Sequence, residues 1–216
     1  MKSIVFDMDG VILDSERIAS GIWHELAAEY GLTDMDEVYP LCIGVTKTVS
    51  AGIFAERYGK DFPYGEFIGK SAERFRAYYQ ENGMPLKKGV VSLLDFLREE
   101  GYQIALASST AQEKVRTQLG EAGVLSYFDA VICGDMLKKS KPEPDIYLLA
   151  CRSLGVSPKD AYAVEDSYNG IRSAYRAGMR ALMVPDMLPP TEEMERLAYR
   201  ILPDLDAVRE FLRKEG

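Results

Sequence analysis

The sequence predicts an α/β fold, a doubly wound parallel sheet into which a helical unit is inserted. Three observations support this prediction. Residues 4–6, Ile-Val-Phe, form a short run of β-formers near the start of the chain. Stretches with helical periodicity follow, up to Asn82-Gly83. From there on, strand-like and helix-like segments alternate, which is typical of a parallel sheet with crossover helices.

The inserted unit is predicted from three helical stretches, residues 15–30, 47–58 and 66–80. A single parallel crossover normally uses one helix, so three in succession indicate a separate unit. We therefore expect a core domain of residues 1–14 and 83–216, and a helical cap domain of residues 15–82.

The second part of the chain supplies the other predicted strands and helices of the core. The strands are 102–107, 130–133, 161–164, 181–184 and 200–202. The helices are 90–100, 111–122, 145–154, 168–177, 191–198 and 206–214. Glycines directly after several of these helices fit left-handed caps.

The composition argues against some classes of binding partner. The chain has 216 residues, of which 47% are hydrophobic and 28% charged, and this is typical of a globular protein. Its net charge of −8 argues against a nucleic acid or an anionic membrane, because both need a basic face. A small phosphorylated metabolite needs only a local positive group. With no apolar run long enough to span a membrane and no signal-peptide pattern, we expect a cytoplasmic protein, with a monomer as the simplest state.

Cysteine and histidine usage excludes some chemistry. Cys42, Cys133 and Cys151 form no Cys-x-x-Cys pair, which favours free thiols over a zinc site or a disulfide framework. His24 is the only histidine, so a site with several histidine ligands or a histidine base is nearly excluded.

Two carboxylates follow the first predicted strand directly. Asp7 and Asp9 lie two residues apart, before Gly10. Two carboxylates at the end of a buried strand are costly unless their charge is compensated, and a divalent cation would do so. The carboxyl ends of inner strands are also where open α/β sheets bind ligands. An ordinary turn is the alternative interpretation, because Asp and Gly are turn residues.

Hydroxyls and one lysine follow at later positions. Ser108, Ser109 and Thr110 come after the strand at 102–107, where they can cap the next helix or bind phosphate, and the two roles are compatible. Lys141 stands in Lys-Pro-x-Pro-Asp, where two prolines stiffen the backbone behind a point charge. The alternative for this lysine is a solvated side chain.

A second acid pair, Glu165 and Asp166, follows the strand predicted at 161–164. Asp166 or Ser167 can instead cap the next helix. Two strand ends that carry acids in one sheet repel each other unless a cation lies between them. Together, these groups are the parts needed for phosphoryl transfer: a carboxylate nucleophile, a carboxylic general acid, a metal, a lysine and a hydroxyl.

The order of these motifs resembles the haloacid dehalogenase superfamily, in its phosphatase and β-phosphoglucomutase-like branch. The motifs are Asp-x-Asp-Gly-Val at 7–11, the strand that ends in serine at 108, Lys-Pro-x-Pro-Asp at 141–145 and Glu-Asp-Ser at 165–167. They extend over essentially the whole chain. The resemblance implies a Rossmann-like core with a helical cap inserted after the first strand.

The resemblance also implies roles for individual residues. Asp7 is the expected nucleophile and Asp9 the general acid and base, while Ser108 and Lys141, with Ser109 beside them, are expected to bind the phosphoryl group. The expected ligands of Mg²⁺ are Asp7, the backbone carbonyl of Asp9, and Asp166, with Glu165 close by or bound through water.

Two departures from the family pattern bear on the substrate. Members of the branch often have Asp-Ser-Glu-Pro-Leu-His at the entry to the cap, whereas residues 14–19 here end in Ala19, which weakens a mutase interpretation. Lys47 stands where a mutase would place an arginine for a second phosphate; a solvated helix start explains it equally well. With Thr46 and Glu16, Lys47 is a candidate substrate contact.

We therefore predict a Mg-dependent phosphatase of a small phosphomonoester, a sugar phosphate or nucleoside monophosphate, that acts through an aspartyl-phosphate. A β-phosphoglucomutase-like phosphomutase is the alternative. Dehalogenation is not expected, because dehalogenases usually lack an acid at the position of Asp9. A non-enzymatic receiver domain also uses acids and a lysine on such a sheet, but it lacks an inserted helical unit.

Overall fold

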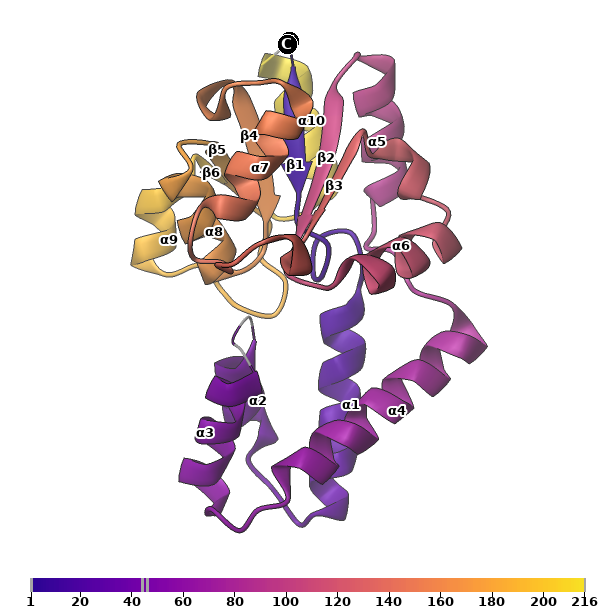
Figure 1. Cartoon of the computed structure of the whole chain (residues 1–216), viewed down its shortest axis with the longest axis vertical. Helices are drawn as coiled ribbons and strands as arrows, with labels where there is room; N and C mark the ends of the chain where they lie inside the picture. Colours follow the sequence, from indigo (N-terminus) through magenta and orange to yellow (C-terminus); the bar gives the residue numbers. More distant parts are fainter. Residues whose placement is uncertain (1, 44, 46, 216) are drawn as a thin grey trace. The chain divides into compact units, whose positions relative to one another are not determined.

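The computed structural model describes residues 2–43, 45 and 47–215 of the chain (Figure 1). Its internal contacts divide it into two compact units, Met1–Asp14 with Met84–Gly216, and Ser15–Gly83. Each unit is described by itself below.

The first unit contains a six-stranded sheet in the order β3-β2-β1-β4-β5-β6, in which every pair of neighbours is parallel. The doubly wound parallel sheet predicted from the sequence is therefore confirmed. The strands are β1 (Ser3–Phe6), β2 (Gln103–Ser108), β3 (Ala130–Cys133), β4 (Ala161–Glu165), β5 (Arg180–Met183) and β6 (Arg200–Ile201).

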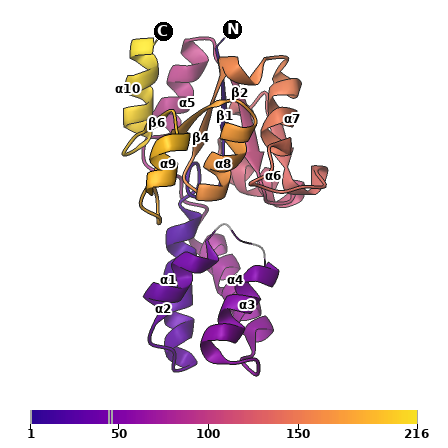
Figure 2. The same cartoon turned by 90° about the vertical axis from the view of Figure 1, so that its left-hand side faces the viewer.

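Helices cover both faces of this sheet. Figure 2 shows α5 and α10 on one side of the sheet and α7 on the other. The helices are α5 (Val90–Glu99), α6 (Gln112–Glu121), α7 (Asp145–Leu154), α8 (Tyr168–Arg176), α9 (Glu192–Leu197) and α10 (Leu205–Glu215). Short 3₁₀ turns at Leu125–Tyr127, Gly134–Met136 and Pro158–Asp160 complete the connections.

The central strands are buried on both faces, and this explains their continuous apolar runs. Ile4, Val5 and Phe6 of β1 have no exposed surface. In the register of the sheet, Phe6 lies opposite Leu106 of β2 and Val164 of β4. The residues that follow these three positions therefore lie close together, at the carboxyl ends of the three central strands.

The second unit consists of α1 (Ser15–Glu29), α2 (Met35–Cys42), α3 (Lys47–Tyr58) and α4 (Tyr64–Asn82). Helix α2 was not predicted, because Pro40 lies inside it and proline normally interrupts a helix. Tertiary packing outweighs that preference: the ring of Tyr39 packs edge-on against Trp23 at 5.0 Å between centroids. Phe54 and Phe67, both fully buried, pack against the same Trp23 ring.

The chain leaves the first unit and returns to it along two paired segments. Leu13 and Leu86 form an antiparallel bridge. The backbone N–H of Asp14 donates to the carbonyl of Pro85, and that of Lys87 donates to the carbonyl of Ile12, both at 2.9 Å. The two linkers therefore hold each other next to the end of β1.

Candidate active site

Lys141 and Asp7 come together at the carboxyl ends of the central strands. The backbone N–H of Asp7 donates to the carbonyl of Val164, which extends the pairing of β1 with β4 by one residue. The ammonium of Lys141 lies 2.5 Å from Asp7 Oδ1 and 2.9 Å from the carbonyl oxygen of Ala107. Its side chain is only 7% exposed, so the interpretation of Lys141 as a solvated lysine is wrong.

Glu165 is fully buried, and its two oxygens bind several donors. Oε1 accepts hydrogen bonds from Lys141 and from the hydroxyl of Tyr147, both at 2.6 Å. Oε2 accepts from the hydroxyl of Ser167 at 3.1 Å. Because it is bonded to Lys141 in this way, Glu165 fixes the position of the ammonium that also contacts Asp7.

Two glycines allow the acids to approach the backbone. A Cβ atom on Gly10 would lie 2.2 Å from Asp166 Oδ2, and Gly10 also has a φ of +79°. A Cβ atom on Gly170 would lie 1.9 Å from the carboxylate of Glu165. A side chain at either position would displace an acid of the site.

The carboxylates of Asp7, Glu165 and Asp166 each offer an oxygen within 4.8 Å of the others, and all three residues are buried. Hard oxygen donors of this kind are what Mg²⁺ and Ca²⁺ bind in proteins. Three buried carboxylates beside one ammonium also leave an excess of negative charge, which a divalent cation would offset. The residues present therefore fit a divalent metal ion.

Burial, and then the neighbouring charges, change the ionisation of Asp7. Burial raises its pKa, Lys141 lowers it, and the charges of Glu165 and Asp9 raise it further, to about 8. Burial alone would lower the pKa of Lys141, but the neighbouring charges of Asp7 and Glu165 outweigh that effect and raise it. The lysine therefore stays protonated, whereas Asp7 needs a further cation, in addition to Lys141, to be a carboxylate at neutral pH.

The other predicted residues of the first unit lie around this cluster. Ser108 is buried, and its hydroxyl accepts a hydrogen bond from the backbone N–H of Thr110 at 3.1 Å. Ser109 is exposed. Asp9 is half-buried, and its Oδ2 accepts a hydrogen bond from the Thr110 hydroxyl at 3.1 Å.

Helix capping was the alternative role for the serines, Thr110 and Asp166, and it is found at α8 but not at α6. Ser108, Ser109 and Thr110 do not cap α6: its N-cap is Ala111, and the backbone N–H of Gln112 donates to the carboxylate of Asp135 instead. Ser167 does cap α8, because its hydroxyl accepts from the N–H of Gly170.

The predicted substrate contacts belong to the second unit. Glu16 Oε2 accepts a hydrogen bond from the hydroxyl of Tyr39 at 2.8 Å, so this carboxylate already has a partner within the unit. Lys47 is exposed at the start of α3. Thr46 lies outside the residues that the structure describes.

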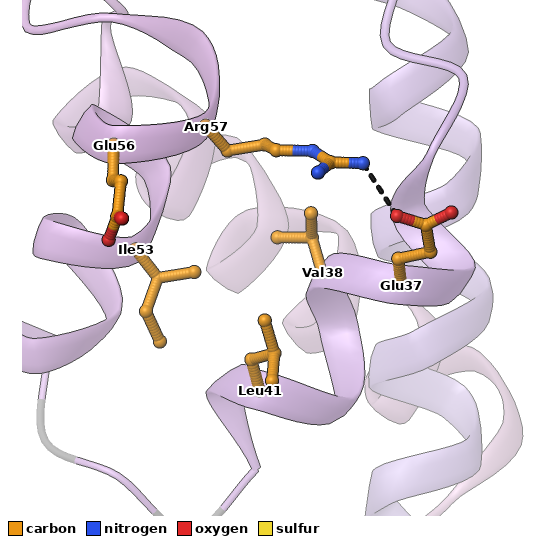
Figure 3. A pocket seen from close by; sticks show the side chains of 6 residues that line it. All are labelled: Glu37, Val38, Leu41, Ile53, Glu56 and Arg57. Carbon is orange, nitrogen blue, oxygen red and sulfur yellow. Dashed lines mark hydrogen bonds and ion pairs between the residues drawn. The ribbon is translucent and has the colours of Figure 1, made fainter.

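A surface hollow of about 420 Å³ also lies in the second unit, between α2 and α3 (Figure 3). None of the predicted site residues lines it. Arg57, its positive group, already pairs with Asp34 and with Glu37, so the hollow offers no open cationic anchor for a phosphate. The lining residues are Glu37, Val38, Leu41, Ile53, Glu56 and Arg57.

Sequence reasoning missed Tyr147 and Gly170. Tyr147 lies six residues after Lys141 in the sequence, in a helical stretch whose other inward positions are apolar, so it was indistinguishable from a core aromatic. Gly170 follows the Glu-Asp-Ser motif and looks like an ordinary helix residue. A glycine in the first turn of a helix, where glycine is disfavoured, was the available signal.

The fold and this cluster define an α/β protein with buried acids and a lysine at the carboxyl ends of its central strands. The chain belongs to the haloacid dehalogenase-like hydrolases, whose family model matches residues 4–184. The family expectation from the sequence is thereby confirmed, and so is the classification of the chain as a hydrolase.

Individual relatives agree with this membership. The chain is 29% identical over 182 residues to the phosphorylated carbohydrates phosphatase of Thermotoga maritima, with 84% of each chain covered. It is 31% identical over 184 residues to the fructose-1-phosphate phosphatase YqaB of Escherichia coli, covering 84% of this chain and 95% of the relative. A crystal structure of a CbbY variant from Rhodobacter sphaeroides, in complex with xylulose-1,5-bisphosphate, superimposes with a TM-score of 0.74 at 30% identity, covering 94% of each chain.

In the part of the chain that the structure describes, no helix combines the length and the apolar character that a membrane span requires.

Proposed function

We propose that this chain is a Mg-dependent phosphatase that hydrolyses a small phosphomonoester through an aspartyl-phosphate on Asp7. The observation that carries the proposal is the cluster of the Asp7, Glu165 and Asp166 carboxylates, two of which, Asp7 and Glu165, contact the ammonium of Lys141. A carboxylate nucleophile, a fixed cation and a cluster of hard oxygen donors are the groups that phosphoryl transfer requires.

In the first half of the reaction, a carboxylate oxygen of Asp7 attacks phosphorus. The bond between phosphorus and the leaving oxygen breaks, and Asp9, as the carboxylic acid, gives its proton to that oxygen. The product alcohol departs, and the phosphoryl group stays on Asp7. Lys141 and Ser108 hold the oxygens of the transferred group, with the lysine ammonium acting as a fixed positive charge.

In the second half, Asp9 is a carboxylate and takes a proton from water. The water oxygen bonds to phosphorus as the bond to Asp7 breaks, which releases inorganic phosphate and restores both aspartates. The net reaction consumes one water molecule.

Asp7, Asp166 and the backbone carbonyl of Asp9 would hold the metal ion, with Glu165 beside them. The carboxylate of Asp166 lies against the backbone of Gly10, next to the proposed carbonyl ligand. Bound Mg²⁺ would screen the anionic nucleophile from the anionic substrate and stabilise the charge of the transition state. Glu165 is already bonded to Lys141, Tyr147 and Ser167, so its main role in this proposal is to fix the lysine.

For the substrate, we propose a sugar phosphate or a nucleoside monophosphate. The printed names of the relatives, which include phosphatases of phosphorylated carbohydrates and of fructose 1-phosphate, support the first class. Lys47, Thr46 and Glu16 remain our candidates for selecting among such compounds.

We expect release of inorganic phosphate from a panel of sugar phosphates and nucleoside monophosphates, with Mg²⁺ required. The panel is assayed for phosphate with and without Mg²⁺. Conversion of β-glucose 1-phosphate to glucose 6-phosphate without phosphate release would instead establish the mutase. A stable phosphoprotein without turnover would overturn both proposals.

The metal-free protein should lose stability as the pH rises from about 5 to about 8, in part because of Asp7. Its pKa is raised from 3.8 to about 8 in the folded protein, so the folded state binds the proton more tightly than the unfolded chain does. The contribution of Asp7 is therefore complete below about pH 4 and is lost as the pH approaches about 8. The measurement is thermal unfolding across this range, for the wild type and for Asp7→Asn.

The comparison of the two proteins separates the effect of Asp7 from that of distant titrating groups such as His24, which contribute equally to both. The melting temperature of Asp7→Asn should fall less steeply with pH. Added Mg²⁺ should raise the melting temperature of the wild type more at about pH 8 than at about pH 5. Identical pH profiles for the two proteins would contradict the assignment.

A further inference from the structure

The hydroxyl of Thr110 contacts the carboxylate proposed as the general acid. Thr110 Oγ1 donates a hydrogen bond to Asp9 Oδ2 at 3.1 Å, between residues 101 positions apart in the chain. Capping of the next helix does not explain this hydroxyl, because Asp135 accepts the N–H of Gln112 at that helix end.

The backbone around Thr110 is fixed by several contacts. Its N–H donates to the hydroxyl of Ser108, and its carbonyl accepts from the N–H of Gly134, both at 3.1 Å. Gly134 approaches the preceding residue so closely that a Cβ atom there would lie 2.2 Å from the carbonyl oxygen of Ser109. The direction of the Thr110 side chain is therefore set by β2 and by the turn after β3.

The loop that contains Asp9 fixes the backbone of this residue. It lies in a tight loop in which the N–H of Gly10 donates to the carbonyl of Leu13 at 2.9 Å. An aspartate carboxyl group is joined to the backbone through two rotatable bonds. A hydrogen bond to one of its oxygens restricts this rotation, and an acid must be held in the right direction to deliver its proton efficiently.

We propose that Thr110 is a positioning residue for Asp9, whose hydroxyl fixes the direction in which the Asp9 carboxyl group delivers its proton to the leaving oxygen. This inference rests on the proposed phosphatase function. Thr110 itself does not bond to the transferred group in this proposal; it acts through Asp9.

The proposal predicts a dependence on the leaving group that a purely structural role would not produce. Glycerol 2-phosphate releases a strongly basic alkoxide, which must be protonated as it leaves. 4-Nitrophenyl phosphate releases a weakly basic phenolate, which can leave without a proton. Misalignment of Asp9 should therefore slow the first substrate much more than the second.

The test compares Thr110→Val, which keeps the shape and removes the hydroxyl, with Thr110→Ser, which keeps the hydroxyl. For Thr110→Val we expect kcat/KM to fall about 10- to 100-fold with glycerol 2-phosphate, a part of the full effect of a general acid. With 4-nitrophenyl phosphate the fall should be no more than about threefold, since little proton transfer is needed. Thr110→Ser should retain most of the activity on both substrates.

Thr117→Val is the matched control. This exposed threonine donates its hydroxyl to the carbonyl of Glu113 within α6, so its removal should change neither rate. The role of Thr110 would be overturned if Thr110→Val lost the same activity on both substrates or became faster than the wild type. It would also be overturned if Thr110→Ser were as slow as Thr110→Val. A wild-type protein that hydrolyses neither substrate would instead overturn the proposed function, so the two failures are distinguishable.

Discussion

Asp7→Asn should abolish turnover, with kcat lowered on the order of 10⁴-fold or more, the scale expected when a covalent nucleophile is removed. The amide nitrogen and oxygen of asparagine cannot form the acyl phosphate. The fold should remain intact, because asparagine has nearly the same shape and relieves the crowding of negative charge beside Glu165. The measurements are steady-state phosphate release and thermal unfolding of the variant.

A second readout identifies the nucleophile directly. After incubation with substrate and rapid acid quenching, mass spectrometry should find one phosphoryl group on the peptide that contains Asp7. Asp9→Asn should also be severely impaired, because no histidine is available to replace it. Asp160→Asn, at an exposed position, is the matched control and should behave like the wild type. Undiminished turnover by Asp7→Asn would remove the assignment.

Lys141→Met should lower both stability and activity. The ammonium contacts Asp7, Glu165 and the carbonyl of Ala107, and its removal leaves the buried carboxylates without their cation. Breaking a buried ion pair by removal of one partner typically costs about 3–5 kcal/mol. Turnover should fall about 10²- to 10³-fold, because a fixed charge on the phosphoryl oxygens is lost. Urea unfolding and phosphate release measure the two effects.

A paired substitution separates the two effects of Lys141. Lys141→Met combined with Glu165→Gln should recover part of the lost stability, because one unpaired charge is removed, while activity stays low. Lys139→Met is the control: this exposed lysine two residues earlier should change stability by no more than about 0.5 kcal/mol. A stable and active Lys141→Met variant would show that the ammonium is dispensable.

The sheet, and the acids at the carboxyl ends of its central strands, could be predicted from the sequence for a specific physical reason. Parallel strands buried on both faces are continuous apolar runs, so the polar residue that ends each run is conspicuous. Asp7 after Phe6, and Glu165 after Val164, are such residues. The register of β1 with β4 then places them side by side.

Other features depend on tertiary contacts that periodicity does not encode. Helix α2 contains Pro40, and its stability comes from the packing of Tyr39 on Trp23. Thr110 was expected only among hydroxyls at a helix start, and its bond to Asp9 joins segments far apart in the chain. The acceptor that replaces those hydroxyls at α6 is the carboxylate of Asp135, which belongs to a turn after another strand.

The antiparallel pairing of Leu13 with Leu86 has a consequence for engineering. The chain leaves the first unit and returns to it through adjacent, hydrogen-bonded residues, so the second unit, Ser15–Gly83, is an insertion at a single point. That segment should therefore be exchangeable between homologues as a cassette, with the junctions placed inside the paired linkers. Chimeras of this kind would show whether the first or the second unit sets the substrate preference, without disturbing the strands that carry the acids.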